Sequence, residues 1–255
     1  MGYGRATSKY EPKALTLFAA ELLGTALLMF LGCMGCIPEV DSPAAFHHLS
    51  SLSFGLVILL IIQAFGHISG AHLNPAVTIA AVLMRMMSPL LGVIYVAAQF
   101  IGALLGFALL KILIPEDYIN DGLCMTSPHK LITTMQALAI EIIITAVLII
   151  VILAVWDKRN ADKPDSVAIR FGFVIAAISM VAGPLTGASM NTVRSFAPAV
   201  LLGNFKDHWI YWVGPNLGAI IGYGIYKYLF SIPEDEDEDS IDETIGLDEV
   251  KPEKL

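Results

Sequence analysis

Apolar residues dominate this chain in long runs that short polar segments separate. A helix needs about 20 largely apolar residues to cross the hydrocarbon core of a bilayer. Six runs are long enough, at residues 14–36, 50–67, 88–112, 131–155, 167–184 and 208–230. Two further apolar stretches, at residues 74–84 and 191–201, are too short to cross. The pattern therefore predicts an all-α membrane protein with six transmembrane helices and two half-helices.

Both short stretches begin in the same way. Small and turn-forming residues interrupt an apolar run, and Asn74 or Asn191 follows as a suitable helix N-cap, with Pro75 or Thr192 at the first helical position. A helix that begins inside a hydrophobic region directs unpaired N–H groups and a positive dipole end at whatever lies there. Lipid tolerates such irregular backbone only where it lines a cavity or is buried in protein. Two re-entrant segments of this kind, one in each half of the chain, indicate a membrane pore or carrier.

The two halves of the chain repeat each other. Phe54-Gly55 precedes Asn74 by the same spacing as Phe171-Gly172 precedes Asn191. The pattern Tyr95-x3-Gln99-x2-Gly102-x3-Gly106 recurs as Tyr211-x3-Pro215-x2-Gly218-x3-Gly222, and glycines spaced by four suit close helix crossings. Each half holds three spans, an odd number, so the second copy enters the membrane from the opposite side. We therefore expect inverted repeats whose half-helices meet near the midplane.

Charge separates the chain into a membrane domain and two tails. Charged residues make up 15% of the sequence, against about 25% in soluble proteins. The net charge of −8 arises after residue 231, where eleven acidic and two basic residues lie, so nothing supports a nucleic-acid partner. We expect an N-terminal tail at 1–13, a membrane domain at 14–230 (repeats at 14–112 and 131–230) and a disordered acidic tail at 231–255. Most remaining bases fall on one side of this topology, which predicts that both termini are cytoplasmic.

The sequence offers no site for a metal, a cofactor or catalysis. Cys33, Cys36 and Cys124 form no recognisable disulfide framework, and no histidine pairs with them at metal-ligand spacing. No nucleophile–base pair stands out either. We therefore expect neither a cofactor nor an enzymatic activity.

The run from Ser69 to Thr78, Ser-Gly-Ala-His-Leu-Asn-Pro-Ala-Val-Thr, resembles the first signature of the aquaporin, or major intrinsic protein, family. In the second copy, Asn191-Thr192-Val193-Arg194 stands where the family usually has Asn-Pro-Ala-Arg. The resemblance covers residues 14–230. It implies pore motifs at Asn74-Pro75-Ala76 and Asn191-Thr192-Val193, and a homotetramer in which each subunit has its own pore.

The resemblance also implies which residues form the selectivity filter. Its four positions fall on Phe54, Ser179, Ala188 and Arg194. Strict water channels of the family have histidine at the second position and often cysteine at the third. With serine and alanine there, the chain resembles the insect entomoglyceroporins, in which a small residue replaces the histidine and glycerol passes.

Buried polar residues near these motifs have expected roles. Asn74 and Asn191 should present amide N–H groups to the pore centre. Arg194 is a charged residue at membrane depth, where a charge is costly, so we expect it to have a functional role. Glu21 and Glu141 should accept hydrogen bonds from backbone N–H groups of the re-entrant loops, a proton relay being the alternative. His72, by hydrogen bonds to backbone, and Gln99, by packing, should support the same structure, with pH gating as the alternative for His72.

We therefore expect a passive channel in the plasma membrane, in contact with lipid, for water and small uncharged solutes such as glycerol, with urea as a further candidate. Protons and ions should be excluded. The alternatives are a water-selective channel, in which a neighbour fills the space beside Ser179, and a junctional or scaffolding membrane protein whose acidic tail recruits partners.

Overall fold

A computed structural model describes residues 12–37, 46–120 and 122–231, and their helices follow the predicted pattern closely. Within these residues six long helices and two half-helices form the bundle: α1 (Ala14–Met34), α2 (Phe46–Ser69), α3 (Pro75–Leu83), α4 (Pro89–Leu113), α6 (Thr134–Trp156), α7 (Val167–Thr186), α8 (Thr192–Leu202) and α9 (Ile210–Leu229). The short helix α5 (Glu116–Asn120) and two 3₁₀ turns, Lys158–Asn160 and Pro164–Ser166, lie in the connections. The expectations for residues 1–11 and 232–255 lie outside the described residues.

The apolar character of the long helices accounts for the membrane fold. Among the described residues, α1, α2, α4, α6 and α7 are each long and apolar enough to cross a bilayer. Helix α9 matches α7 in length at 20 residues but carries Asn216 and Lys227, which reduce its mean hydropathy. The predicted all-α fold of six transmembrane helices and two half-helices is therefore confirmed. The main boundary difference is α2, which begins at Phe46 rather than at residue 50.

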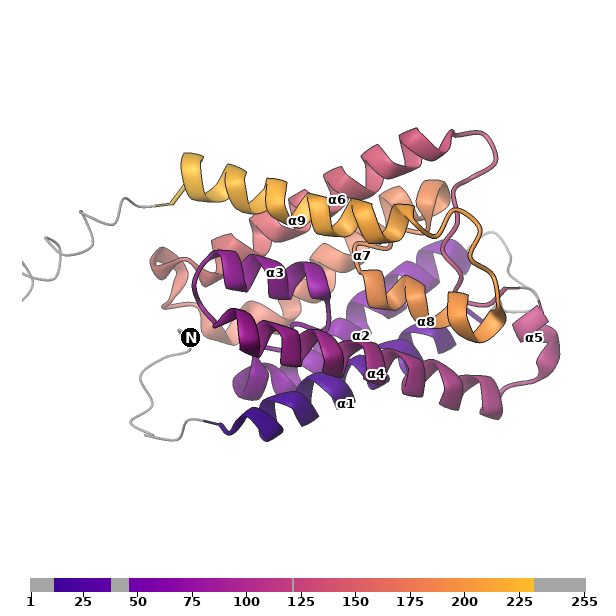
Figure 1. The fold of residues 1–255 in the computed structure, drawn as a ribbon, viewed down its shortest axis with the longest axis horizontal. Helices are drawn as coiled ribbons and strands as arrows, with labels where there is room; N and C mark the ends of the chain where they lie inside the picture. Colours follow the sequence, from indigo (N-terminus) through magenta and orange to yellow (C-terminus); the bar gives the residue numbers. More distant parts are fainter. Residues whose placement is uncertain (1–11, 38–45, 121, 232–255) are drawn as a thin grey trace, which may run out of the picture.

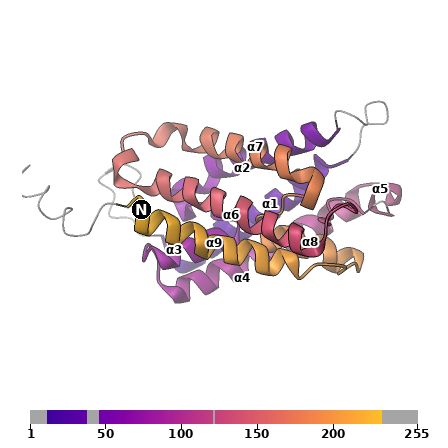
Figure 2. The same cartoon turned by 90° about the horizontal axis from the view of Figure 1, so that it is seen from above.

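The half-helices lie head to head inside the bundle. Figure 1 shows α3 and α8 directed toward each other from opposite ends, with the long helices running alongside them. The start of α1 and the end of α9 lie at the same end of the molecule (Figure 1). Helices α2 and α7, the equivalent helices of the two repeats, lie side by side, as Figure 2 shows from above.

Glycines allow the helices to approach at the positions that the repeat pattern singled out. A Cβ atom on Gly55 would lie 2.3 Å from the Gly172 carbonyl oxygen, so these two repeat-related glycines form the α2–α7 contact. A Cβ on Gly106 would lie 2.0 Å from the Ala26 carbonyl oxygen in α1, and one on Gly222 would lie 2.7 Å from the Ala146 carbonyl oxygen in α6. The predicted close crossings at Gly106 and Gly222 are confirmed, one in each repeat, and the α2–α7 crossing joins the two repeats.

Candidate functional site

Each half-helix is capped by the asparagine that the sequence indicated. Asn74 Oδ1 accepts from the N–H of Ala76 at 2.9 Å, and α3 begins at Pro75. Asn191 Oδ1 accepts from the N–H of Val193 at 3.1 Å and that of Arg194 at 3.4 Å. The second cap therefore forms although Thr192 replaces the proline of the first repeat, because threonine is compatible with helical backbone at this position.

The two caps also bind each other's loops, which the sequence analysis missed. Asn74 Nδ2 donates to the carbonyl oxygen of Met190 at 2.8 Å, and Asn191 Nδ2 donates to that of Leu73 at 2.9 Å. Leu73 (φ 56°) and Met190 (φ 50°) both adopt left-handed backbone, which is uncommon for non-glycine residues. The side-chain amide nitrogen of asparagine carries two hydrogens, and each asparagine donates one of them to the opposite loop.

Two buried glutamates hold the loops in this conformation. Glu21 Oε1 accepts from Ser69 Oγ at 2.7 Å and from the N–H of His72 at 2.9 Å, while its Oε2 accepts from the N–H of Leu73 at 2.8 Å. Gln99 Nε2 donates to the same Oε2 at 2.8 Å. The expectation that Glu21 accepts from the backbone of the re-entrant loop is confirmed.

Glu141 does the same in the second repeat. It accepts from Thr186 Oγ1 at 2.6 Å and from the N–H groups of Ser189 at 3.0 Å and Met190 at 2.9 Å. Pro215, which stands where the first repeat has Gln99, has no side-chain donor. Glu141 therefore accepts fewer hydrogen bonds than Glu21, but it serves the loop in the same way.

Gln99 and His72 connect the first loop to its half-helix. Gln99 Nε2 also donates to Thr78 Oγ1 at 3.0 Å, so it does more than the packing expected of it. The ring Nδ1 of His72 lies 3.2 Å from the same hydroxyl, and the ring centroid lies 5.7 Å from that of Trp156. The His72 side chain was expected to hydrogen-bond to backbone, but within the described residues its ring bonds to the Thr78 hydroxyl instead. Its backbone N–H donates to Glu21, and its ring lines the cavity described next.

A cavity of about 410 Å³ passes beside the heads of the two half-helices. Asn74 and Asn191 both line it. It extends from Tyr118 in α5 to Trp156 at the end of α6, and these two elements lie at opposite ends of the bundle (Figure 1). Its apolar wall comes from α2, α6 and α7, through Ile58, Ile62, Leu148, Ile152 and Ile175. The cavity is therefore lined by polar groups of the half-helices on one side and by apolar side chains on the other.

The four positions assigned to a selectivity filter line the same cavity. Phe54, Ser179, Ala188 and Arg194 come from α2, α7, the second re-entrant loop and α8. The guanidinium carbon of Arg194 lies 4.9 Å from the centroid of the Phe54 ring, within cation–π distance. Arg194 is only 8% exposed, and its Nη1 donates to the carbonyl oxygen of Cys124 at 2.5 Å. The structure thus brings together residues that lie up to 140 positions apart in the sequence.

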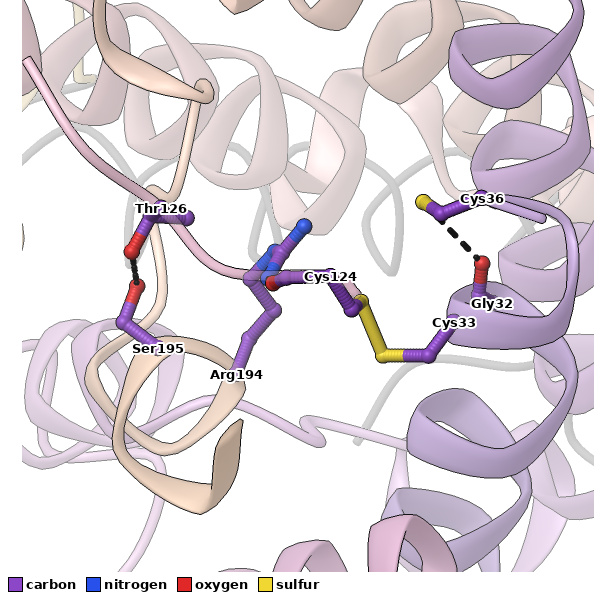
Figure 3. The surroundings of a disulfide bond; sticks show 7 residues. All are labelled: Gly32, Cys33, Cys36, Cys124, Thr126, Arg194 and Ser195. Carbon is purple, nitrogen blue, oxygen red and sulfur yellow. Dashed lines mark hydrogen bonds between the residues drawn. A yellow bond between two sulfur atoms is a disulfide. The ribbon is translucent and has the colours of Figure 1, made fainter. Parts of the chain in front are cut away.

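The cysteines require a correction. Cys33 and Cys124 form a disulfide with a Cα–Cα distance of 5.3 Å, and 91 positions separate them in the sequence (Figure 3). The expectation that the cysteines form no disulfide was wrong, because Cys33 lies in the last turn of α1, beside the loop that follows α5. Cys36 keeps a free thiol, which donates to the carbonyl oxygen of Gly32 at 3.6 Å.

Comparison with known proteins agrees with this geometry. A family model described as major intrinsic protein matches residues 9–226. Aquaporin-4 of Homo sapiens is 46% identical over 182 residues, which cover 71% of this chain and 56% of that protein, so the match spans little more than half of that relative's length. Aquaporin-2 of Rattus norvegicus is 40% identical over 210 residues, covering 82% of this chain and 77% of that protein.

The fold also matches a solved structure. The X-ray structure of the aquaglyceroporin from Plasmodium falciparum superposes with a TM-score of 0.73 at 25% sequence identity. The match covers 85% of this chain and 97% of the other. With its family model, its relatives and its paired half-helices in agreement, the chain belongs to the major intrinsic protein family, the aquaporins.

Proposed function

We propose that this chain is a passive membrane channel for water and small uncharged solutes such as glycerol, with urea as a further candidate. The observation that carries the proposal is the cavity that Asn74, Asn191, Phe54, Ser179 and Arg194 line together. Family membership supports it, as does similarity both to proteins named aquaporins and to one named an aquaglyceroporin. Such a channel needs no catalytic group, and we assign none.

The asparagines give the centre of the pore its selectivity against protons. Each amide has one hydrogen bound to the opposite loop, which leaves the second for a passing oxygen. A water oxygen that accepts from both asparagines has its lone pairs occupied and cannot relay a proton. The positive ends of α3 and α8 converge on the same point and repel cations.

The residues of the filter favour a solute with both apolar and hydroxyl faces. Phe54 offers an apolar wall, and the guanidinium of Arg194 offers donors to hydroxyl oxygens. Ser179 is much smaller than the histidine of strict water channels, so more space remains opposite Phe54. The carbon backbone of glycerol can lie against the ring while its hydroxyls meet Arg194. This same feature supports the resemblance to the entomoglyceroporins.

Swelling of proteoliposomes in water and glycerol gradients tests the proposal. We expect the wild-type channel to conduct both. Ser179→His should abolish glycerol flux and retain water flux, because an imidazole narrows the filter. Ser179→Ala is the matched control, since it removes the hydroxyl without filling space, and it should still conduct glycerol. Glycerol flux that persists in Ser179→His would show that the filter is assigned wrongly.

The two alternatives are outcomes of the same assay. Water flux without glycerol flux in the wild type would indicate a water-selective channel. Flux of neither above that of empty liposomes would favour a scaffolding protein, whose acidic tail lies outside the described residues.

We further propose that the channel is a homotetramer in the plasma membrane with both termini cytoplasmic. The start of α1 and the end of α9 lie at one end of the bundle, which supports a common side for the termini (Figure 1). The excess of basic residues on that side supports its assignment to the cytoplasm. Accessibility of tags at each end in intact cells tests the orientation.

A further inference from the structure

We propose that the Cys33–Cys124 disulfide positions Arg194 in the selectivity filter, so that the covalent bond sets which solutes pass. This inference rests on the proposed channel function. It assigns Cys33 and Cys124 as positioning residues, since neither sulfur needs to touch a permeating molecule.

Arg194 depends on a loop carbonyl for its placement. Its guanidinium donates to the Cys124 carbonyl oxygen at 2.5 Å and lies over the Phe54 ring. No carboxylate within the described residues forms a salt bridge with it. The position of the guanidinium across the lumen therefore follows the position of the Cys124 backbone.

That backbone belongs to a loop, and the disulfide is its covalent attachment to the bundle. Cys124 has a φ of 62°, which is uncommon for a residue with a side chain. Figure 3 shows the bond to Cys33 on one side of the Arg194 contact and, on the other, the hydrogen bond from Thr126 Oγ1 to Ser195 Oγ at 2.8 Å. One neutral hydrogen bond between side chains contributes little by itself. The backbone bond from the N–H of His129 to the carbonyl oxygen of Leu185 lies five residues further along the loop, so the disulfide is the strong anchor nearest to the Cys124 carbonyl.

The other anchor point, in α1, also sets the opposite wall of the filter. Gly32 precedes Cys33, and a Cβ atom on it would lie 2.7 Å from the Phe54 ring. Cys33 itself is fully buried. A single turn of α1 therefore contacts Phe54 through Gly32 and fixes the Cys124 carbonyl through Cys33. This turn of α1 therefore sets the distance between the Phe54 ring and the Arg194 guanidinium.

Removing the disulfide leaves the acceptor in place, because Cys124→Ser keeps its backbone carbonyl. The loop then moves relative to α1, and Arg194 no longer holds one position opposite Phe54. We expect the ratio of glycerol to water permeability to rise by about twofold in Cys33→Ser/Cys124→Ser, which corresponds to the low end of the net strength of one hydrogen bond. Cys36→Ser is the matched control, because it removes the third thiol and leaves the disulfide intact. Cys36 lines the same cavity, so the ratio of this variant gives the baseline for a thiol-to-serine change in the lumen.

The ratio distinguishes positioning from mere stabilisation. A purely structural bond would lower the amount of folded channel and reduce both permeabilities together, so the ratio would stay at the wild-type value. A wild-type channel that conducts and a double-serine variant with an unchanged ratio would overturn the inference. A wild-type channel that conducts neither water nor glycerol would instead refute the proposed function.

Chemical reduction of the wild type provides a second arm that does not depend on folding of the variant. A water-soluble phosphine takes oxygen from water to become the phosphine oxide, and the disulfide gains two hydrogens to become two thiols. Phosphine is added until all three cysteines of a subunit react with maleimide in an aliquot that has been freed of phosphine and unfolded in sodium dodecyl sulfate. The ratio should rise in this protein, return on reoxidation, and not respond in the double-serine variant. No change in the fully reduced wild type would also overturn the inference.

Discussion

Replacement of Glu21 tests whether a buried carboxylate sets the shape of the first pore loop. Glu21 is fully buried and accepts from the backbone N–H groups of His72 and Leu73 and from the side chains of Ser69 and Gln99. Side-chain donors can turn toward other partners, but the two backbone N–H groups are fixed by the loop. The number of backbone donors left unpaired therefore determines the cost of each substitution.

The expected magnitudes follow from that number. A buried donor without an acceptor costs about 1–3 kcal/mol. In Glu21→Gln, the new NH₂ group can face the Ser69 hydroxyl, which is able to accept, so the N–H of His72 alone loses its acceptor and the cost is about 1–3 kcal/mol. In Glu21→Leu both backbone N–H groups lose theirs, and the cost doubles to about 2–6 kcal/mol.

The thermal midpoint of purified channel in detergent, followed by loss of monodisperse elution, measures the effect. We expect the order wild type, Glu21→Gln, Glu21→Leu, from most to least stable, with water permeability per folded channel falling in the same order. Glu116→Gln in α5 is the control, because Glu116 is exposed and should leave the midpoint unchanged. A midpoint for Glu21→Leu equal to that of the wild type would refute the reasoning.

Two further predictions concern packing and pH. Gly106→Val should prevent assembly of α1 with α4, because a Cβ at residue 106 would lie 2.0 Å from the Ala26 carbonyl oxygen. Gly224→Val is the control, because Gly224 has open space around it and the variant should give a normal yield of folded channel. Equal yields of the two variants would contradict this prediction. The Arg159 guanidinium beside Asp157 holds the pKa of that carboxyl well below its usual range, so the stabilisation it gives is complete above the unfolded-state pKa of about 4 and is lost as pH falls toward the folded-state pKa. The loss of thermal midpoint on acidification below about pH 4 should therefore be smaller in Asp157→Asn, and an identical acid profile would count against this interaction.

The sequence was sufficient for the features that depend on local pattern. Apolar run length predicted the helices, and the turn residues before Asn74 and Asn191 predicted two capped half-helices, because capping is decided within a few residues. Glu21 and Glu141 were also predictable, since a buried carboxylate and an irregular buried backbone require each other.

Contacts between distant segments were not predictable in the same way. The disulfide links Cys33 to a loop residue 91 positions away, and no spacing rule indicates such a pair. The reciprocal bonds from Asn74 to Met190 and from Asn191 to Leu73 likewise appear only once both loops are folded. The four filter positions were carried over from a family pattern. The structure adds a contact that the four positions do not include, the hydrogen bond that Arg194 donates to the Cys124 carbonyl oxygen.

The exchanged bonds between the two half-helix caps have a consequence for how material crosses the membrane. A transporter that works by alternating access must rock one repeat against the other and so open each side in turn. Here the asparagine cap of each repeat holds a backbone carbonyl of the other repeat, where the heads of the two half-helices meet. Rocking would break both bonds and leave buried amides without partners. The two bonds therefore oppose rocking of one repeat against the other, which supports the proposed passive channel over alternating access.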